Sequence, residues 1–386
     1  MERIEIEVDE RRLAQDNEKR DRLQRTEAFE QTDRVPVIIN TNQWTALAAR
    51  NRTARDYLRS PADNLREQIL NAKWRIENIL DDQPVSDRLT IRPDLGCLRG
   101  VEFEMDIAWP ENGPPKCDHP LKEIEQVDQL AIPSPDGGIN ARRIEWYYAM
   151  VEAVRDIEVT LNGRLLSVDI TLGQPGGPIP AAFALAGANM FLWMAAEPDR
   201  MHRLMGIVTE SHINCVRFFD EMMGRDPVHP VGMGGDAGEM LSPAMFGEFV
   251  VPYYRKVWEA YPGPRGFHNC GNNEHLLDII RDDLAIASHN GFGFCVDPEV
   301  LVVKMAGRVV LRGGPDPSLV KSGSYEEIYS AAKTYIETLG QRGGFVLSLG
   351  GGAAPGTPVE HYHVMVEASR EVVCYDCYYL HVRRSQ

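Results

Sequence analysis

The stretch Gly266-Phe267-His268-Asn269-Cys270-Gly271-Asn272-Asn273 decides which fold the chain is expected to adopt. It has the composition of a buried strand that ends in small polar residues and passes into a helix. Side chains two residues apart in a strand point to the same face, so His268 and Cys270 are expected to project into one cavity. Imidazole and thiolate are both zinc ligands. From these residues alone, half of a zinc site and a buried histidine beside an inert cysteine are both open interpretations.

Similar apolar runs recur along the chain and alternate with helical segments. They lack the polar–apolar alternation of half-exposed strands, which is typical of parallel strands covered on both faces. The expected strands are 35–40, 89–94, 165–170, 229–236, 266–270, 284–288, 308–314 and 344–350. The main expected helices are 62–81, 141–156, 179–223 with a break at 197–199, 243–261, 273–282, 325–341 and 358–380. Eight such strands predict an α/β fold of the (β/α)8 barrel (TIM barrel) class, with an open doubly wound sheet as the competing arrangement.

The chain is expected to form one domain with an extension at its N-terminus. Residues 1–33 are dominated by charge and are predicted to be a helical lead-in outside the core, whereas 34–386 are predicted to form the barrel. Residues 95–140 are rich in proline and glycine. A loop of this length inside a compact domain is usually functional, for instance a lid or the wall of a pocket, and a surface insertion is the alternative.

Composition excludes several classes of partner. Hydrophobic residues make up 43% of the chain and charged residues 25%, as in soluble globular proteins. The formal net charge of −16 argues against nucleic acid or an anionic membrane as a partner. The seven scattered cysteines suit reduced thiols or metal ligands. No apolar segment is long enough for a membrane span and no secretory signal is evident, so a cytoplasmic protein is expected.

Barrels of this class carry their chemistry at the carboxyl ends of the strands. The residues expected there include the catalytic candidates Asp169, Asp236 and Glu239, and the substrate-binding candidates Asn40, Asn42, Trp44, Arg92 and His289. Cys295 lies just beyond the sixth strand and is the candidate for a third metal ligand beside His268 and Cys270, or else a packed apolar residue. Asp236 and Glu239 could each supply an oxygen ligand, a general base or a helix cap.

Two further motifs are less specific. Cys374 and Cys377 have CxxC spacing but no second pair, so structural thiols are expected. The glycine-rich segment 350–358 either lets a ligand approach the backbone closely or forms a tight turn. The chain has neither a Gly-x-Ser-x-Gly elbow nor a phosphate-binding P-loop, which argues against a serine hydrolase and against P-loop phosphoryl transfer.

Six short motifs together carry a family resemblance. They are Asp-Arg-Val-Pro-Val at 33–37, Gly-Asp-Ala-Gly at 235–238 with Leu-Ser-Pro at 241–243, Val-Pro-Tyr at 251–253, His-Asn-Cys-Gly-Asn at 268–272, Gly-Gly-Pro-Asp-Pro at 313–317 and Ala-Pro-Gly-Thr-Pro at 354–358. In this order and spacing they resemble the uroporphyrinogen decarboxylase superfamily of (β/α)8 barrels. They are most similar to its corrinoid-dependent methyltransferase branch.

The chain departs from that superfamily at two positions. Decarboxylases of this type carry an arginine-rich motif after the first strand, where this chain has Asn-Thr-Asn-Gln-Trp-Thr at 40–45. They also carry a histidine in the last glycine turn, where the zinc methyltransferases have a third cysteine ligand and this chain has Gly351. The resemblance therefore implies His268 and Cys270 as zinc ligands. It leaves Cys295, Asp236 or Glu239 to complete the site, or no metal at all.

The resemblance implies a methyltransferase. Such an enzyme moves a methyl group between a small O-methyl, N-methyl or S-methyl substrate and a separate protein that carries cobalamin, a corrinoid. Zinc would act as a Lewis acid on the heteroatom in this demethylation. The neutral mouth expected from Asn40, Asn42 and Trp44 suits a methoxylated or N-methyl substrate better than a polyanion. A decarboxylase of a non-porphyrin acid and a non-catalytic ligand-binding barrel are the alternatives.

Overall fold

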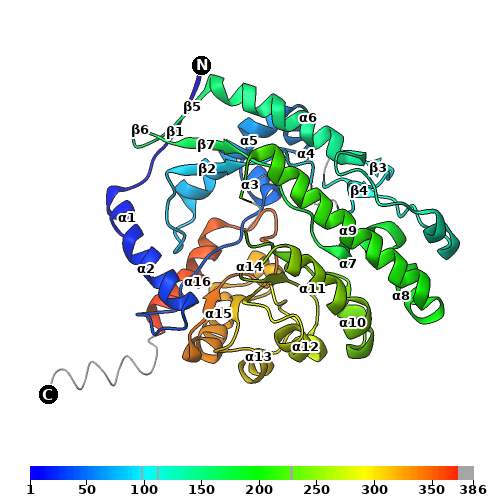
Figure 1. Ribbon diagram of the computed structural model, residues 1–386. Helices are drawn as coiled ribbons and strands as arrows, with labels where there is room; N and C mark the ends of the chain where they lie inside the picture. Colours follow the sequence, from blue (N-terminus) through cyan, green and yellow to red (C-terminus); the bar gives the residue numbers. More distant parts are fainter. Residues whose placement is uncertain (97–98, 111–112, 227–228, 373–386) are drawn as a thin grey trace.

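A continuous parallel sheet forms the centre of the computed structural model, which describes residues 1–96, 99–110, 113–226 and 229–372 (Figure 1). Its five strands are adjacent in sequence order. They are β8 (Met233–Gly234), β9 (Gly266–His268), β10 (Ser288–Asn290), β11 (Val310–Gly313) and β12 (Phe345–Leu347). All of the pairings are parallel, so the carboxyl ends of the strands meet at one edge.

The first and last strand segments pair with each other. Val37 lies opposite Leu347 in a parallel bridge, and the Ile38 amide donates to the Leu347 carbonyl at 2.9 Å. At the other edge of the sheet, the Gly234 amide donates to the Gly176 carbonyl at 2.7 Å, which joins β8 to the chain that follows β7 (Ser167–Ile170). The strand β7 pairs in parallel with β2 (Arg88–Ile91). This order of neighbours is that of a (β/α)8 barrel, as predicted, and not that of an open doubly wound sheet.

Two aspartates satisfy the outer edge of the first strand segment. The Val37 amide donates to Asp82 Oδ2 at 2.8 Å, and the Ile39 amide donates to Asp81 Oδ2 at 2.8 Å. Asp82 is buried and also accepts a hydrogen bond from Arg34 Nη1 at 2.7 Å. Charge-assisted bonds of this kind hold the segment in place although it is not paired with β2 by backbone hydrogen bonds.

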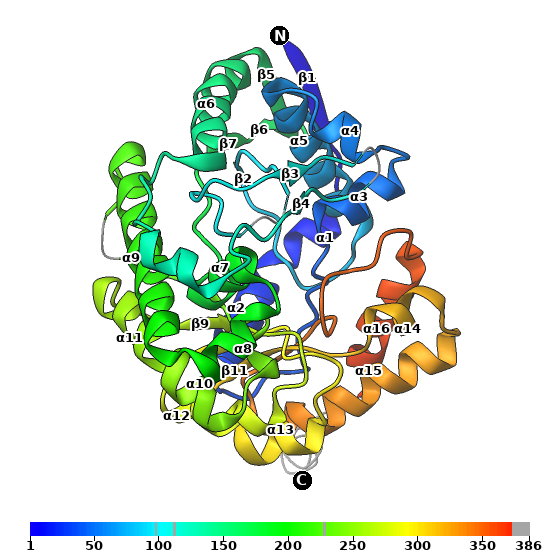
Figure 2. The same cartoon turned by 90° about the vertical axis from the view of Figure 1, so that its right-hand side faces the viewer.

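Helices surround the sheet (Figure 2). The α10 helix begins as predicted, because the Ser242 hydroxyl caps it and Pro243 occupies its first position. The helices after the first strand segment are α3 (Gln43–Ala49), α4 (Ala54–Tyr57), α5 (Pro61–Asn78), α6 (Gly138–Ala153), α7 (Pro178–Ala186), α8 (Asn189–Ala196), α9 (Pro198–Met223), α10 (Pro243–Phe249), α11 (Val251–Ala260), α12 (Leu277–Asp282), α13 (Pro298–Lys304), α14 (Pro317–Ser322), α15 (Tyr325–Leu339) and α16 (Val359–Glu371). Short 3₁₀ turns cover 124–129, 154–156, 238–240, 274–276 and 340–342. Cys374 and Cys377 lie outside the described residues.

The prediction of a wholly helical N-terminal segment was wrong for its first residues. The helices α1 (Glu10–Ala14) and α2 (Asp16–Glu27) are present, but β1 (Glu2–Ile6) precedes them. It pairs with β5 (Ile157–Leu161), which also pairs with β6 (Arg164–Leu165). Ile4 and Ile6 are buried and alternate with charged residues, the period of a strand. This small sheet lies with α5 and α6 in the upper part of Figure 1.

The sixth strand was predicted too early in the sequence. The expected strand was 284–288, whereas β10 covers Ser288–Asn290. Leu284 and Ile286 are buried, but Ala285 has a φ of +52°, which interrupts an extended strand. Burial of this apolar run therefore does not require a strand.

The long segment after β2 has little regular structure. It holds a short hairpin, β3 (Ile107–Ala108) with β4 (Lys116–Cys117).

In the described part of the chain no single helix is long and apolar enough to cross a membrane, and α7 with α8 would reach that length only across a bend of 102°.

Candidate functional site

Three potential metal ligands converge at the ends of two neighbouring strands. Asp236 follows β8, and His268 and Cys270 lie at the end of β9. His268 Nε2 lies 3.6 Å from Asp236 Oδ1, and Cys270 Sγ lies 3.7 Å from the same oxygen. The three ligand atoms all lie within 4.8 Å of one another. The structure thus brings His268 and Cys270 together as the strand pattern predicted, with Asp236 as the third member.

A buried asparagine fixes a second carboxylate beside this cluster. The Asn269 side chain is fully buried, and its Nδ2 donates to the Gly235 carbonyl at 2.7 Å and to Glu239 Oε2 at 3.1 Å. Asn273 Nδ2 in turn donates to Asn269 Oδ1 at 3.1 Å. Glu239 is therefore held by the Asn269 side chain, which is itself anchored to the Gly235 carbonyl after β8 and to Asn273.

The local charge favours a cation. Burial and the neighbouring carboxylates of Asp236 and Glu239 raise the pKa of the Cys270 thiol to about 11. Two carboxylates, an imidazole and a sulfur offer the oxygen, nitrogen and sulfur donors that zinc binds in proteins. The donor set therefore fits a zinc ion held by Asp236, His268 and Cys270.

Two glycines after β10 make room for these ligands. Gly291 has a φ of +61°, and a Cβ there would lie 2.8 Å from His268 Cε1. Gly293 has a φ of +79°, and a Cβ there would overlap the Cys270 carbonyl. Only glycine accepts both the left-handed backbone and the close approach.

The cysteine predicted as third ligand does not join the cluster. Cys295 is exposed, and the group of three ligand atoms found among the described residues contains Asp236 in its place. The turn through Gly291 and Gly293 carries the chain past the end of β10 before Cys295 is reached. Sequence position beyond a neighbouring strand was therefore a poor guide to where this thiol lies.

His289 lies in the core and does not reach the cavity. It is 0% exposed, and its ring stacks on Phe267 with centroids 5.6 Å apart. Neither ring nitrogen has a hydrogen-bond partner among the residues that the structure describes. Burial, with a smaller contribution from His268, lowers the pKa of His289 to about 3. The expected contact with substrate is therefore not supported by its position.

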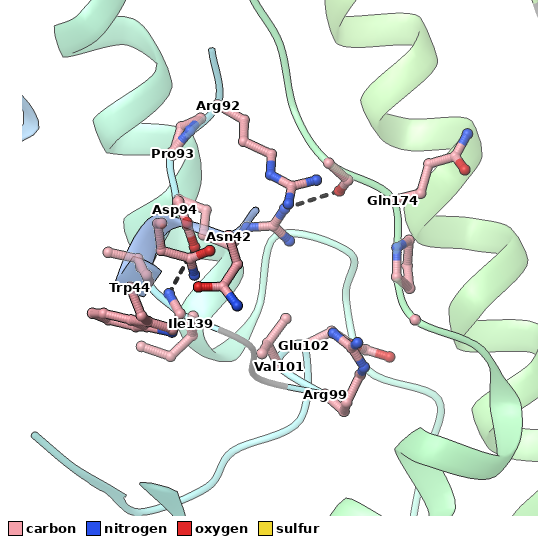
Figure 3. Close-up of a pocket in the computed structure, with 18 residues that line it drawn as sticks. Asn42, Trp44, Arg92, Pro93, Asp94, Arg99, Val101, Glu102, Ile139 and Gln174 are labelled. Carbon is pink, nitrogen blue, oxygen red and sulfur yellow. Dashed lines mark hydrogen bonds between the residues drawn. The ribbon is translucent and has the colours of Figure 1, made fainter. Parts of the chain in front are cut away.

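A second feature of the mouth is a cavity of about 410 Å³ (Figure 3). The predicted residues Asn42, Trp44 and Arg92 line it. The loop after β2 forms one wall, as expected for a long proline- and glycine-rich segment. Two other predicted residues lie elsewhere.

Asn40 and Asp169 do not line this cavity. The Asn40 carbonyl accepts a hydrogen bond from the Ala353 amide at 3.2 Å, which ties the first strand segment to the last glycine turn. The Asp169 carboxylate forms an ion pair with Arg88 at 2.9 Å. The Asp169 carboxylate is thus directed to Arg88 and not to the cavity.

The cavity also contains residues that sequence reasoning missed, namely Arg99, Arg143 and Gln174. Arg99 lies in the irregular loop after β2, and Arg143 lies in α6. No local pattern in the sequence links these residues, because they come from separate elements and meet only through the fold.

Comparison with known proteins agrees with this architecture. A family model described as uroporphyrinogen decarboxylase (URO-D) matches residues 18–372. A protein named uroporphyrinogen decarboxylase from Xanthomonas oryzae pv. oryzae is 26% identical over 302 residues, which cover 73% of this chain and 77% of the relative. One of the same name from Nitrosomonas europaea is 24% identical over 297 residues, covering 73% and 76%.

The same fold is found in solved structures, for example in the following one. It is described as a methyltransferase from Methanosarcina mazei and matches with a TM-score of 0.63 at 20% sequence identity. The match covers 92% of this chain and 98% of that chain. Likeness at this identity concerns the architecture of the two proteins.

Proposed function

The chain belongs to the uroporphyrinogen decarboxylase family, and on that premise we propose that it is a methyltransferase. It moves a methyl group between a small O-methyl, N-methyl or S-methyl substrate and a separate cobalamin-binding protein. The observation that carries this proposal is the convergence of Asp236, His268 and Cys270 within 4.8 Å at the ends of β8 and β9. The likeness in fold to a protein described as a methyltransferase supports the reaction class.

Asp236, His268 and Cys270 would hold a zinc ion at this position. Zinc supplies a Lewis acid that stabilises negative charge on the heteroatom from which the methyl group departs. With Gly351 in the last turn, Asp236, which follows β8, would take the third ligand position. Cys295 has no part in the site in this proposal.

Glu239 handles the proton in this reaction. In the demethylating direction the bond between methyl carbon and heteroatom breaks, and its electron pair stays on the heteroatom. The cobalamin of the partner protein would accept the methyl group as a nucleophile, and the heteroatom takes up one proton. Asn269 holds Glu239 Oε2 at 3.1 Å beside the cluster, which suits Glu239 to deliver that proton. Asp169 is engaged by Arg88, so we retain Glu239 as the acid.

A decarboxylase acting on a small, non-porphyrin acid is the second candidate. The names of the curated relatives favour it. The segment 40–45 lacks the arginines that would hold a porphyrinogen, so that substrate is not proposed. For either reaction we expect the protein to work in the cytoplasm.

Incubation of the zinc-loaded protein with reduced cobalamin and candidate methyl donors tests the proposal. Conversion of the cobalamin spectrum to that of methylcobalamin supports the methyltransferase. Release of carbon dioxide from a tested acid, with no change in the cobalamin spectrum, would replace it by the decarboxylase.

A further inference from the structure

The cavity of Figure 3 concentrates cations in a strongly acidic protein. Arg92, Arg99 and Arg143 line it, against the two carboxyl groups of Asp94 and Glu102. The chain as a whole carries a formal net charge of −16. The cavity therefore has the opposite sign to its surroundings.

Both carboxyl groups in the cavity are engaged by uncharged donors. Asp94 Oδ2 accepts from the Tyr57 hydroxyl at 2.8 Å, and Glu102 Oε1 accepts from the Ser211 hydroxyl at 2.7 Å. Neither forms an ion pair with Arg92 or Arg143, and no other carboxylate in the described chain does so. Within the described part of the chain, the charge of these two guanidinium groups is therefore not balanced by a salt bridge.

Two guanidinium groups approach the same glycine. A Cβ on Gly173 would lie 3.4 Å from both Arg92 Nη1 and Arg143 Nη2. Arg143 is held in place, because it donates to the Gly173 carbonyl and to Asn140 Oδ1 at 2.9 Å each. Burial and the neighbouring charge of Arg92 lower the pKa of Arg143. Two converging cations repel each other, and an anion bound between them removes that cost.

The opposite wall of the cavity is formed by the side-chain amide of Asn42 and the indole of Trp44. Asn42 is fixed because it caps α3 through the Thr45 amide at 3.0 Å and donates to the Ala353 carbonyl at 3.2 Å. Trp44 packs edge-on against Tyr57 with centroids 6.0 Å apart. Figure 3 shows Arg92 and Arg99 reaching in from opposite sides, with Asn42 and Trp44 together on the side between them. The volume of about 410 Å³ suits a small molecule.

The arginine side of the cavity adjoins the strand that carries Asp236. A Cβ on Gly176 would overlap the Arg99 guanidinium, so the two are in contact. The Gly176 carbonyl accepts from the Gly234 amide at 2.7 Å, two residues before Asp236. The Tyr254 hydroxyl donates a hydrogen bond to the Gly234 carbonyl. Burial is the main cause that raises the pKa of Tyr254; the charge of Asp236 raises it further and the charge of Arg99 lowers it. Asp236 and Arg99 therefore act on the same side chain.

We infer that Arg92 and Arg143, assisted by Arg99, bind a carboxylate of the methyl-bearing substrate. The substrate class is a small carboxylic acid with an apolar part that can pack against Trp44. Arginine guanidinium groups match carboxylates through paired hydrogen bonds. The inference rests on the proposed methyltransferase and revises the expectation of a neutral mouth, since the three arginines were not seen as a group in the sequence.

Calorimetric titration of the full-length protein tests this inference without any corrinoid protein. The probes are ortho-, meta- and para-methoxybenzoate, each compared with the corresponding neutral methoxybenzamide. We expect at least one acid to bind about tenfold or more tightly than its amide, because a hydrogen bond to a charged group is stronger than a neutral one. The inference is overturned if no acid binds more tightly than its amide.

Three variants locate the effect. Arg92→Gln and Arg143→Lys should each weaken binding of the acid by about ten- to a hundredfold and leave binding of the amide unchanged. Arg155→Gln is the matched control, because Arg155 is an exposed arginine paired only with Glu152 among the described residues. Circular dichroism establishes that each variant is folded. If Arg92→Gln does not fold, the binding affinity of Arg143→Lys decides the test. Wild-type affinity for the acid in both cavity variants would contradict the inference.

The binding inference and the proposed reaction fail separately. Preference for the acid without methylation of cobalamin removes the methyltransferase and keeps the carboxylate site. Methylation of cobalamin from amides and acids alike removes the carboxylate site and keeps the methyltransferase.

Discussion

At the carboxyl ends of β8 and β9, Asp236, His268 and Cys270 gather donors suited to a cation. At the ends of β2 and β7, Arg92 and Arg143 gather donors suited to an anion. The two regions share one barrel mouth and are joined by the hydrogen bond between Gly234 and Gly176. Their difference shows that the net charge of −16 is a guide to large partners, such as nucleic acid, against which it argues. It says little about the charge of a small-molecule site.

Removal of a ligand on the cation side should have the largest effect. His268→Ala and Cys270→Ala each delete a donor, and zinc affinity should fall by more than about a hundredfold, since even outer-shell changes cost up to that much. Zinc content by plasma mass spectrometry and the methylcobalamin assay measure the effect.

Cys295→Ala is the matched control for the thiol. Its zinc content and activity should equal those of the wild type, because Cys295 lies outside the cluster. Loss of zinc in Cys295→Ala with retention in Cys270→Ala would reverse the ligand assignment.

Acid should destabilise the fold through His289, whose ring stacks on Phe267 next to His268. His289 has a folded pKa of about 3, below its usual value of about 6.5, so its neutral ring stabilises the fold above about pH 6.5. That contribution is lost as the pH falls toward about 3, and it amounts to roughly 3 kcal/mol between about pH 6.5 and pH 4. Urea unfolding at a series of pH values should show this loss in the wild type.

His289→Phe keeps a ring against Phe267 and removes the titrating group. The fall in unfolding free energy between neutral and acidic pH should therefore be smaller in the variant. The remaining dependence includes His212, whose pKa burial lowers to about 4. An unchanged pH dependence in His289→Phe would contradict the placement of a neutral, unpartnered ring in the core.

Two buried asparagines, one beside each region, allow the two regions to be compared by a milder change than loss of a metal ligand. Asn269→Ala removes the hydrogen bond to Glu239 and should lower zinc affinity or methyl transfer by about ten- to a hundredfold. Asn64→Ala is its counterpart at the end of β2, because Asn64 is equally buried and bonds to the backbone of Tyr57 and Asp94. It should destabilise the fold without changing zinc affinity. Equal loss of zinc in both variants would mean that the two regions are not distinct.

The smallest effect is expected at Gly173. Its Cβ in Gly173→Ala would lie 3.2 Å from Arg92 Cδ, so the arginine must shift. Crowding of about 1 kcal/mol predicts that KM for an acid substrate rises about fivefold, with zinc content unchanged. Steady-state kinetics with an acid and its amide measure it, and a rise in KM for both substrates would contradict a specific effect on the carboxylate site.

The sequence predicted the barrel because its strand segments are continuous apolar runs. The prediction failed in two places. The buried apolar run around Ala285 is not a strand, because Ala285 has a positive φ and β10 begins only after it. The segment Glu2–Ile6 is a short strand although most of its residues are charged. The boundary at residue 33 between extension and barrel stays a prediction.

The cation side was predictable because its parts are local. His268 and Cys270 are two residues apart, and Asp236 ends the neighbouring strand. The anion side was not, because Arg99 and Arg143 come from an irregular loop and from a helix, and meet Arg92 only through the fold. Cys295 failed as a prediction for the same reason, since a left-handed turn decides where it lies.

X-ray absorption at the zinc edge of the wild-type protein tests the central claim most directly. One sulfur at about 2.3 Å, with nitrogen and oxygen neighbours at about 2.0–2.2 Å, is the result expected from Cys270, His268 and Asp236. Two sulfur neighbours, or none, would contradict the site described for this chain.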